Sequence, residues 1–423
     1  VTVLMGWLGC VGLFEPWLAL LGTSTLLFTV FAGLVTWRLW LLVVATTPGF
    51  RTTRTDNSSS LRPVYTILIA LYREGSTING LARAVSELDW PAQSKDIILL
   101  TEAGDAMTQT AISNAAWPQG TRVLVLPPGA PRTKPRALNY GLAHARGDYV
   151  CVYDAEDRPH ASQLKAAEAA FKLGGRQLAC VQAPLAGDNH RQSWLALHWT
   201  LEYAVQFGLL LPALSRLGLP LLLGGTSNHF RRSALMYENG WDAWNVTEDA
   251  DLGVRLAARG YRTATITPPT FEEAPETLNV WIAQRSRWLK GFLQTWVVMM
   301  ARPKRALKEL GIWGFLSLQF GLIGTCLAAL AHGPLILLTA AALAFGADLP
   351  VAAIILMAAG YGINAIAALI APGPRGMRRW LGVFTLPLYW PLQSLAASRA
   401  LYGYIRSPHF WAKTPHGVTS AQR

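Results

Sequence analysis

Three carboxylates stand close together near the middle of the chain, directly after a short apolar segment. Asp154, Glu156 and Asp157 follow residues 148–153, which have the composition of a buried strand. Closely spaced carboxylates suit a hard divalent cation, Mg2+ or Mn2+, that is bound partly through the phosphates of a substrate. The same residues would suit the start of a helix, where acidic side chains are common. The motif by itself leaves both interpretations open.

A basic motif precedes these carboxylates. Lys134-Pro-Arg136-Ala-Leu-Asn139 lies at the approach to a segment with helical periodicity, residues 135–145. A lysine or arginine at this position could contact a diphosphate through charge-assisted hydrogen bonds. The alternative is a basic, solvated helix start, and the motif does not decide between the two.

An acidic motif, Thr247-Glu248-Asp249, comes before a predicted helix over residues 250–259. Asp249 is a candidate general base that takes a proton from an attacking hydroxyl. The alternative is a helix cap, with Thr247 or Asp249 as the capping residue. A catalytic role requires Asp249 to lie near the carboxylates at 154–157.

Gln284, Arg287 and Trp288 fall on one side of a predicted helix, because positions i, i+3 and i+4 are neighbours on a helix surface. Their amide, guanidinium and indole groups would therefore form one patch. Arg287 is placed to contact a diphosphate, and Trp288 to pack against a sugar ring.

An aromatic stripe runs along the same segment. Trp281, Trp288, Phe292 and Trp296 lie within about 80° of each other on a helical wheel, and Lys290 lies opposite. This pattern predicts an amphipathic helix within residues 281–310 that lies in a membrane interface. The alternative is an aromatic stripe buried inside the protein.

Strand-like and helix-like segments alternate through the first part of the central region, which predicts a parallel sheet flanked by helices. The expected strands are residues 64–71, 96–100, 122–126 and 148–153, and the expected helices are 76–88, 106–116 and 135–145. Ligands bind at the carboxyl ends of the strands in such a sheet. Glu74 follows the first strand, and Glu102 and Asp105 follow the second. We therefore expect these side chains to converge with Asp154 on one site.

Composition indicates that this central region is held in a membrane. The chain has 423 residues, of which 52% are hydrophobic and 17 are Trp, which is too apolar for an ordinary soluble enzyme. An unbroken apolar segment over residues 17–37 has the length of a membrane helix, and residues 3–14 form a shorter segment before it. The C-terminal candidates are residues 311–331, 334–345, 351–371 and 380–404. We expect four to six spans in total.

Basic residues predict the orientation of the chain. Arg51, Arg54 and Arg62 follow the first span, and residues 302–308 carry four further basic side chains before the next. The positive-inside rule then places residues 51–310 in the cytosol. The basic loop 372–380 also favours the cytosol, which conflicts with four C-terminal spans. The net charge of +12 fits contact with anionic lipid, and no nucleic-acid motif accompanies it.

These observations divide the chain into five expected parts. They are an N-terminal anchor (1–50), a cytosolic domain (51–280), an interface helix (281–310), a membrane region (311–405) and a cytosolic tail (406–423). The four Cys are widely spaced and suggest neither a disulfide framework nor a metal site.

The four motifs, in this order, resemble the family 2 glycosyltransferases with membrane spans, the group that contains cellulose, hyaluronan and chitin synthases. The resemblance covers roughly residues 62–300, and Pro275-Glu276-Thr277 is similar to the cellulose-synthase side of the family. It implies an α/β, Rossmann-like GT-A domain inserted between transmembrane helices. It also implies an inverting transfer from an α-linked UDP-sugar.

The resemblance also implies a role for each motif residue. Glu74 and Glu102 would line the uridine pocket, with Asp105 as a third member, and Lys134 would approach the diphosphate. Asp154 and Glu156 would hold Mg2+ or Mn2+, with Asp157 as the alternative ligand because Glu156 replaces the usual second Asp. Asp249 would be the base. The acceptor and the diphosphate would contact Thr247, Glu248, Gln284, Arg287 and Trp288, and residues 224–228 would form an acceptor-site segment.

The expected product is a growing β-linked polysaccharide, made processively from UDP-glucose and exported through the membrane spans. One alternative is the transfer of a single sugar to a membrane lipid. Another is a non-catalytic membrane scaffold or receptor with the same fold. The expected partners are a UDP-sugar, a glycan or lipid acceptor and membrane lipids, without nucleic acid. The expected location is the inner (plasma) membrane of a bacterium.

Overall fold

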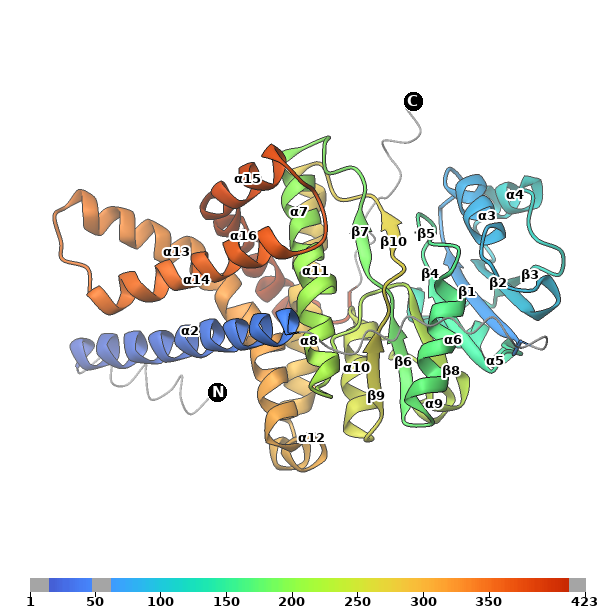
Figure 1. The fold of residues 1–423 in the computed structure, drawn as a ribbon, viewed down its shortest axis with the longest axis horizontal. Coiled ribbons are helices and arrows are strands. Elements are labelled where there is room, and N and C mark those ends of the chain that lie inside the picture. The colour runs from blue at the N-terminus through green and yellow to red at the C-terminus, as the bar shows by residue number, and fades with distance from the viewer. Residues whose placement is uncertain (1–14, 48–61, 411–423) are drawn as a thin grey trace.

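A computed structural model describes residues 15–47 and 62–410 of the chain (Figure 1). A mixed sheet domain occupies one end of the molecule, and long helices extend from the other end. The possible span at residues 3–14 lies outside the described residues, as do Arg51, Arg54 and most of the expected tail.

The main sheet has seven strands in the order β3-β2-β1-β4-β8-β6-β9. Its first four strands along the chain are parallel to one another and confirm the four that the sequence predicts. They are β1 (Tyr65–Leu71), β2 (Lys95–Glu102), β3 (Arg122–Leu126) and β4 (Tyr149–Tyr153). β8 (Asn228–Arg231) is antiparallel to its neighbours β4 and β6 (Leu178–Gln182), and β9 (Arg262–Thr265) is parallel to β6.

Both faces of this sheet are buried, because successive side chains of a strand point to opposite faces. Leu68 of β1 packs against the helix Lys134–His144 on one face, while Ile67 and Ile69 pack against the helices Ile78–Ser86 and Gln163–Gly174 on the other. The helices of this part are α3 (Ile78–Ser86), α4 (Ala106–Asn114), α5 (Lys134–His144) and α6 (Gln163–Gly174). They confirm the three predicted helices and add α6.

A second, three-stranded sheet has the order β5-β10-β7. Its strands are β5 (Arg158–Pro159), β7 (Leu185–Gly187) and β10 (Thr270–Glu272). Because β5 begins directly after the carboxylates at 154–157, this small sheet brings residue 272 close to them in space, although more than a hundred residues separate them along the chain.

Four further helices lie between β7 and β9 along the chain. They are α7 (Trp194–Val205), which continues through a π-helical turn (Gln206–Leu210) into α8 (Leu211–Arg216), α9 (Arg232–Tyr237) and α10 (Glu248–Ala258). α10 confirms the helix expected after the Thr247-Glu248-Asp249 motif.

The expected interface helix differs from the structure in two ways. Residues 281–310 belong to two helices, α11 (Leu278–Met300) and α12 (Pro303–Leu318). Lys290, expected on the polar face, is buried, and its Nζ donates to the carbonyls of Ser407 (2.7 Å) and Phe410 (2.9 Å). Trp281 is also fully buried and donates to the Tyr389 hydroxyl (2.9 Å). α11 is therefore packed on both faces, and the alternative of a buried aromatic stripe holds at Trp281.

Three helices are long and apolar enough to cross a membrane within the described residues, where the sequence analysis names five candidate segments. They are Leu21–Thr46 of α2 (Pro16–Thr46), Pro303–Ala344, and α14 (Val351–Ile370). Pro303–Ala344 combines α12, which is kinked at the non-helical residue Gly311 (φ 66°), a π-helical turn (Gln319–Gly324) and α13 (Thr325–Ala344). Pro334 lies inside α13, so the expected segments 311–331 and 334–345 form one helix.

The last expected span, residues 380–404, is divided at Thr385 and is not one of the three. α15 (Met377–Phe384) and α16 (Leu386–Arg406) lie on either side of this residue. The Thr385 hydroxyl bonds to Trp194 Nε1 and to His198 Nε2 of α7, each at 2.9 Å. These bonds attach the α15–α16 junction to the sheet domain.

Candidate active site

A single cavity of about 630 Å³ lies at the carboxyl ends of β1, β2 and β4 and continues between the membrane helices α2, α13 and α14. It brings together every site residue predicted from the sequence except Asp105 and Asp157. The predicted residues that line it are Glu74, Glu102, Lys134, Asp154, Glu156, Thr247, Glu248, Asp249, Gln284, Arg287 and Trp288.

The basic and acidic motifs meet at Lys134, the first residue of α5. Its Nζ forms an ion pair with Asp154 and donates to the carbonyl of Gly225 (2.6 Å). Burial lowers the pKa of Lys134, but the charges of Asp154 and Glu248 outweigh that effect and leave the pKa raised. Lys134 is therefore a fixed cation beside the carboxylates, as a diphosphate site requires.

Asp154 and Glu156 line the cavity, whereas Asp157 is turned into the protein and is almost fully buried. One Asp157 oxygen accepts from the backbone N–H of Asp154 (2.7 Å) and from the Thr226 hydroxyl. Burial raises the pKa of Asp157 well above its ordinary value, and Asp154 and Glu156 raise it further. Asp157 thus fixes the turn that presents the other two carboxylates.

Two cavity-lining carboxylates fit a divalent cation that completes its shell with substrate oxygens. Among the described residues, no group of three or more His, Cys, Asp or Glu side chains is arranged to hold a metal ion unaided. Asp154 and Glu156 are thus suited to a metal that arrives with a diphosphate.

Glu272, at the end of β10, is a cavity residue that the sequence reasoning missed. Burial raises its pKa well above the ordinary value, and the carboxylates Asp157, Glu156 and Asp154 raise it further. Its Oε1 is buried without a hydrogen-bond partner among the described residues. The available signal was the short run Thr270-Phe271-Glu272-Glu273, in which an aromatic residue is followed directly by acidic residues, as Tyr153 is followed by Asp154.

The acidic residues after β1 and β2 have different surroundings. Glu102 pairs with Arg136 (3.2 Å) at the cavity wall, and the backbone N–H of Glu74 donates to the Thr108 hydroxyl (3.0 Å). Asp105 caps α4 by accepting from the backbone N–H of Thr108 (3.3 Å). Asp105 therefore holds a helix start and lies outside the cavity lining.

Asp249 lies in the first turn of α10, beside the residue 224–228 segment, and lines the cavity. One of its oxygens accepts from the backbone N–H of Ala250 (2.8 Å), and the other would lie 3.2 Å from a Cβ placed on Gly225. Burial raises the pKa of Asp249, although the Ala250 N–H, Lys134 and Arg287 oppose the shift. Burial also raises the pKa of Glu248 to about 7, with a further contribution from Asp249.

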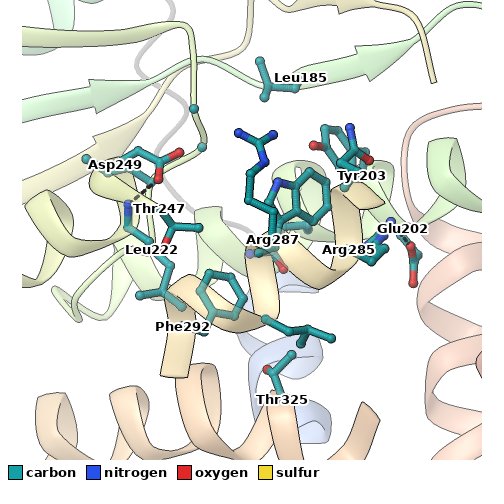
Figure 2. A pocket seen from close by; sticks show the side chains of 18 of the residues that line it. Leu185, Glu202, Tyr203, Leu222, Thr247, Asp249, Arg285, Arg287, Phe292 and Thr325 are labelled. Atoms are coloured by element: carbon teal, nitrogen blue, oxygen red, sulfur yellow. Dashed lines mark hydrogen bonds and ion pairs between the residues drawn. The ribbon is translucent and has the colours of Figure 1, made fainter. Parts of the chain in front are cut away.

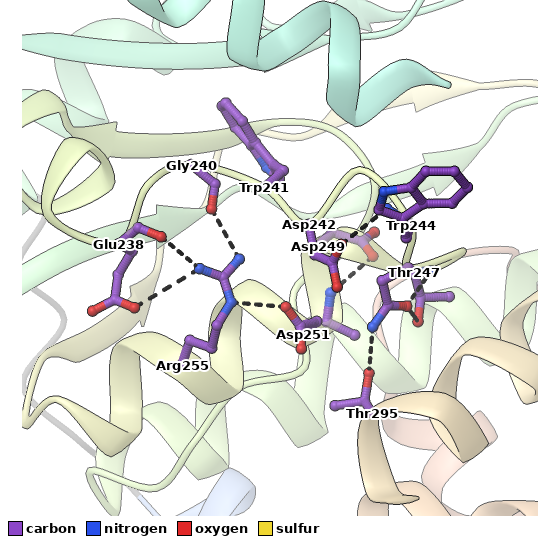
Figure 3. Close-up of polar contacts among 12 residues, drawn as sticks. Glu238, Gly240, Trp241, Asp242, Trp244, Thr247, Asp249, Asp251, Arg255 and Thr295 are labelled. Carbon is purple, nitrogen blue, oxygen red and sulfur yellow. Dashed lines mark hydrogen bonds and ion pairs between the residues drawn. The ribbon is translucent and has the colours of Figure 1, made fainter. Parts of the chain in front are cut away.

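Arg255 holds α10 in place, as Figure 3 shows. Its guanidinium donates to the carbonyls of Glu238 and Gly240, each at 2.9 Å, and pairs with Asp251 (2.8 Å). These contacts fix the start of the helix that carries Asp249.

The turn before Asp249 is also attached to α11. Asn245 donates to the Thr295 hydroxyl (3.1 Å), and the backbone N–H of Val246 donates to Gln294 (3.2 Å). A Cβ at Gly291 would lie only 2.7 Å from the Cβ of Thr247, so glycine is needed for this close approach. α11 therefore carries its own motif and positions Asp249 as well.

The α11 motif faces the cavity opposite Asp249. Arg287 directs its guanidinium into the cavity between Asp249 and Tyr203 (Figure 2). Gln284 is buried and accepts from Trp199 Nε1 (2.9 Å), and the ring of Trp288 lies 5.9 Å from that of Tyr203. Aromatic surface beside a guanidinium can bind a sugar and its diphosphate together.

Arg285 belongs to a second polar cluster that the sequence reasoning missed. It pairs with Glu202 of α7, which also accepts from the Tyr389 hydroxyl (2.8 Å) and from Gln393 (3.2 Å) of α16. Arg285 and Glu202 line the cavity where it leaves the sheet domain. The partners come from helices far apart in sequence, so no local motif signals this cluster.

Comparison with known proteins assigns the chain to a family. Residues 149–366 match glycosyl transferase family group 2. The chain is 30% identical to the UDP-forming cellulose synthase catalytic subunit of Xanthomonas axonopodis pv. citri over 55% of its own length and 32% of that protein. It is 24% identical to the beta-monoglucosyldiacylglycerol synthase of Synechocystis sp. over 63% of its length and 56% of that protein. The chain spans about half the length, or less, of the curated relatives it matches.

The fold matches a solved structure over nearly the whole chain. The mannosyltransferase PcManGT of Pyrobaculum calidifontis, in complex with GDP-Man and Mn2+, superposes with a TM-score of 0.59 at 19% identity, covering 89% of this chain and 96% of that one. This likeness identifies the sheet domain as the GT-A fold. With a family match over half its length and this fold around its cavity, the chain belongs to glycosyl transferase family group 2.

Proposed function

We propose that this protein transfers a sugar from a UDP-sugar, with a divalent metal ion and with inversion, to an acceptor that reaches the site from the membrane. The observation that carries this proposal is the continuity of the cavity. One space contains Lys134, Asp154 and Asp249 and also reaches Phe31 and Val35 of the membrane helix α2.

The donor end is assigned to the sheet domain. Asp154 and Glu156 would hold Mg2+ or Mn2+ together with the diphosphate, and the metal would neutralise charge on the departing nucleotide. Glu74 and Glu102 lie at the strand ends where the uridine would bind. The UDP-forming cellulose synthase relative supports UDP, while the mannosyltransferase structure with GDP-Man makes GDP-mannose the control donor.

The transfer is assigned to Asp249 and Arg287. Asp249 accepts the proton of the acceptor hydroxyl, whose oxygen attacks the anomeric carbon as the bond to the diphosphate oxygen breaks. Arg287 and Lys134 stabilise the negative charge that develops on the leaving UDP. A single displacement on an α-linked donor gives a β-linked product.

The membrane end of the cavity favours a lipid acceptor. The α2 and α14 residues there include Phe31, Leu34, Val35 and Ile363, which suit an acyl chain better than a glycan. A growing polysaccharide remains a second candidate, because Tyr203 and Trp288 both line the cavity, with ring centroids 5.9 Å apart, and offer aromatic surface for sugar rings. The two relatives described above, a cellulose synthase and a glycolipid synthase, support one candidate each.

We place the protein in the inner membrane of a bacterium, with its catalytic domain in the cytosol. Basic side chains support this orientation, because Lys304, Arg305 and Lys308 are exposed in the first turns of α12, where the sheet domain ends and the membrane helices begin. A cytosolic domain would have direct access to a nucleotide-sugar.

UDP release by the purified full chain in lipid tests the proposed function. A panel of UDP-sugars and GDP-mannose would be supplied with Mg2+, with Mn2+ or with chelator, and the product would then be sized. Metal-dependent release with a single sugar on lipid supports the lipid acceptor, and a long β-glycan supports the polymer. Nucleotide-sugar binding without turnover would support the scaffold alternative and contradict the proposal.

A further inference from the structure

Arg38 is a charged residue in a helix that is otherwise suited to a membrane. It lies in α2, within the apolar span Leu21–Thr46, about 12 Å before the end of the helix at roughly 1.5 Å per residue. A charge inside an apolar span is costly, and such residues face a cavity or a partner when they have a function. Arg38 lines the cavity that contains the candidate active site.

The side of α2 that carries Arg38 faces the protein. Leu41 and Leu42, one turn later, are buried against the π-helical turn after α7 and against α14. Leu39 and Val43, on the other side, are about half exposed, at 49% and 56%. Arg38 is therefore directed into the molecule rather than towards the surrounding lipid.

Arg38 has no direct partner there. It forms no hydrogen bond or ion pair with the residues at 15–47 and 62–410, and its Nε is buried and unpaired within that part of the chain. The carboxylate that attracts it is Glu202. Glu202, however, already accepts from Arg285, Tyr389 and Gln393. The cavity thus contains a guanidinium whose hydrogen-bonding capacity is unused.

A phosphate is the group that best complements this guanidinium. Arginine binds phosphate oxygens through paired, charge-assisted hydrogen bonds. Trp37 precedes Arg38 and Trp40 lies two residues after it, and tryptophans concentrate at the level of lipid head groups. Phe31, Leu34 and Val35 extend the same cavity along α2 with apolar surface. The ligand that matches a phosphate site beside an apolar groove is a phosphate-bearing lipid.

We propose that the membrane end of the cavity binds a lipid that carries a phosphate group, with the phosphate on Arg38 and the acyl chain against α2. If the proposed function holds, this lipid is the acceptor, and a hydroxyl of its head group is the nucleophile presented to Asp249. The binding site itself does not depend on the transfer reaction, so the two can be tested separately.

The test is native mass spectrometry of the full chain from mixed micelles that contain equal amounts of dioleoyl phosphatidylglycerol and dioleoylglycerol. These lipids share their acyl chains and differ by the phosphate and its glycerol. The wild-type chain is expected to retain phosphatidylglycerol over dioleoylglycerol by about tenfold, the effect of a charge-assisted hydrogen bond. Arg38→Gln should abolish the preference, and Arg38→Lys should keep part of it.

Arg216→Gln is the matched control. Arg216 donates to the carbonyls of Val44 and Thr47 at the end of the same helix, each at 2.9 Å, but does not line the cavity. This variant should keep the wild-type preference, and UDP binding should be equal in all variants, which shows that the sheet domain is folded.

Three results would overturn the proposal. They are equal retention of the two lipids by the wild type, an unchanged preference in Arg38→Gln, and displacement of the lipid by inorganic phosphate alone. Because no donor is present, the lipid preference is measured even if no nucleotide-sugar proves to be a substrate. If the transfer reaction failed, the lipid site would still be supported by the lipid preference. If the lipid preference failed, the proposed transfer reaction would not be contradicted.

Discussion

Asp249 is a carboxylate whose surroundings disfavour its charged form. Burial is the largest influence and raises its pKa, and the Ala250 N–H, Lys134 and Arg287 only partly oppose it. A general base is more effective when its pKa lies nearer the working pH. The half-buried position of Asp249 in the cavity wall is thus consistent with its proposed role.

The pH dependence of kcat should report this raised pKa. Asp249 acts as a base only when deprotonated, so the rate should fall as the pH falls through its pKa, by about tenfold per unit below it. The acid limb should lie above pH 4, the ordinary range of an aspartate. The measurement is kcat against pH at saturating donor and metal. The Glu248→Gln variant should show the same fall of kcat at acid pH as the wild type. A kcat that stays constant down to about pH 4 would contradict the assignment of Asp249 as the base.

Substitution of two neighbouring carboxylates can identify the metal ligand. Glu156→Gln should raise the metal concentration needed for half-maximal activity by at least about tenfold, because Glu156 lines the cavity. Asp157→Asn should leave that concentration near wild type, because an amide oxygen can still accept from the Asp154 N–H. The measurement is a metal titration of UDP release. The opposite pattern would make Asp157 the ligand.

At the scale of elements, α11 links the acceptor side of the cavity to the catalytic turn. Gln284 and Arg287 lie near its start, and Gln294 and Thr295 contact the Asn245–Val246 segment one turn after the close approach at Gly291. A shift of α11 against the Asn245–Val246 segment should therefore move Asp249, even when no residue of the motifs is changed.

Gly291→Ala tests this link. The added methyl would clash with Thr247 and shift the turn that carries Asp249, and a displacement of about 1 Å can reduce kcat by about a hundredfold. Gly80→Ala is the control, because Gly80 lies in α3 with no atom near an added Cβ, and alanine favours a helix by up to about 1 kcal/mol. The measurements are kcat and thermal unfolding of both variants. Wild-type kcat in Gly291→Ala would disprove the link.

Elements with a strong local pattern were predictable, and those defined by distant partners were not. The four parallel strands show in the sequence because each is a short apolar run bounded by polar residues, such as Asp148 to Asp154. β10 has only three residues and pairs with β5 and β7, so no local pattern predicted that Glu272 would lie at the site. The wheel of α11 identified an aromatic stripe but not the partner of Lys290, which comes from residues 407–410.

The arrangement of the whole molecule depends on how many times the chain crosses the membrane. A proline at 334 and a polar loop at 372–380 suggested additional breaks and spans, but helices of a membrane region tolerate proline. We propose that the three candidate spans in α2, Pro303–Ala344 and α14 each cross the membrane, which would return residues 371–379 to the side of the sheet domain. Arg375, Arg378 and Arg379 would then obey the positive-inside rule.

Introduced cysteines test this topology. Met377 and Ala347 are exposed residues beyond opposite ends of α14, and each would be changed to Cys with Cys10 and Cys326 replaced by Ser, so that only the buried Cys151 and Cys180 remain. Residue 377 should react with a membrane-impermeant maleimide only after the cells are opened, and residue 347 should react in intact cells. Equal labelling of both positions in intact cells would show that α14 does not cross the membrane and would contradict this topology.

Asp249→Asn is the measurement that tests the central claim most directly. The variant keeps the size of the side chain but cannot accept a proton, so product formation should fall by about a hundredfold or more while UDP affinity stays at the wild-type level. Asp242→Asn, an exposed position outside the cavity lining, should retain full activity. If Asp249→Asn instead turned over like the wild type, the cavity would not use Asp249 as its base, and the proposed mechanism would be wrong.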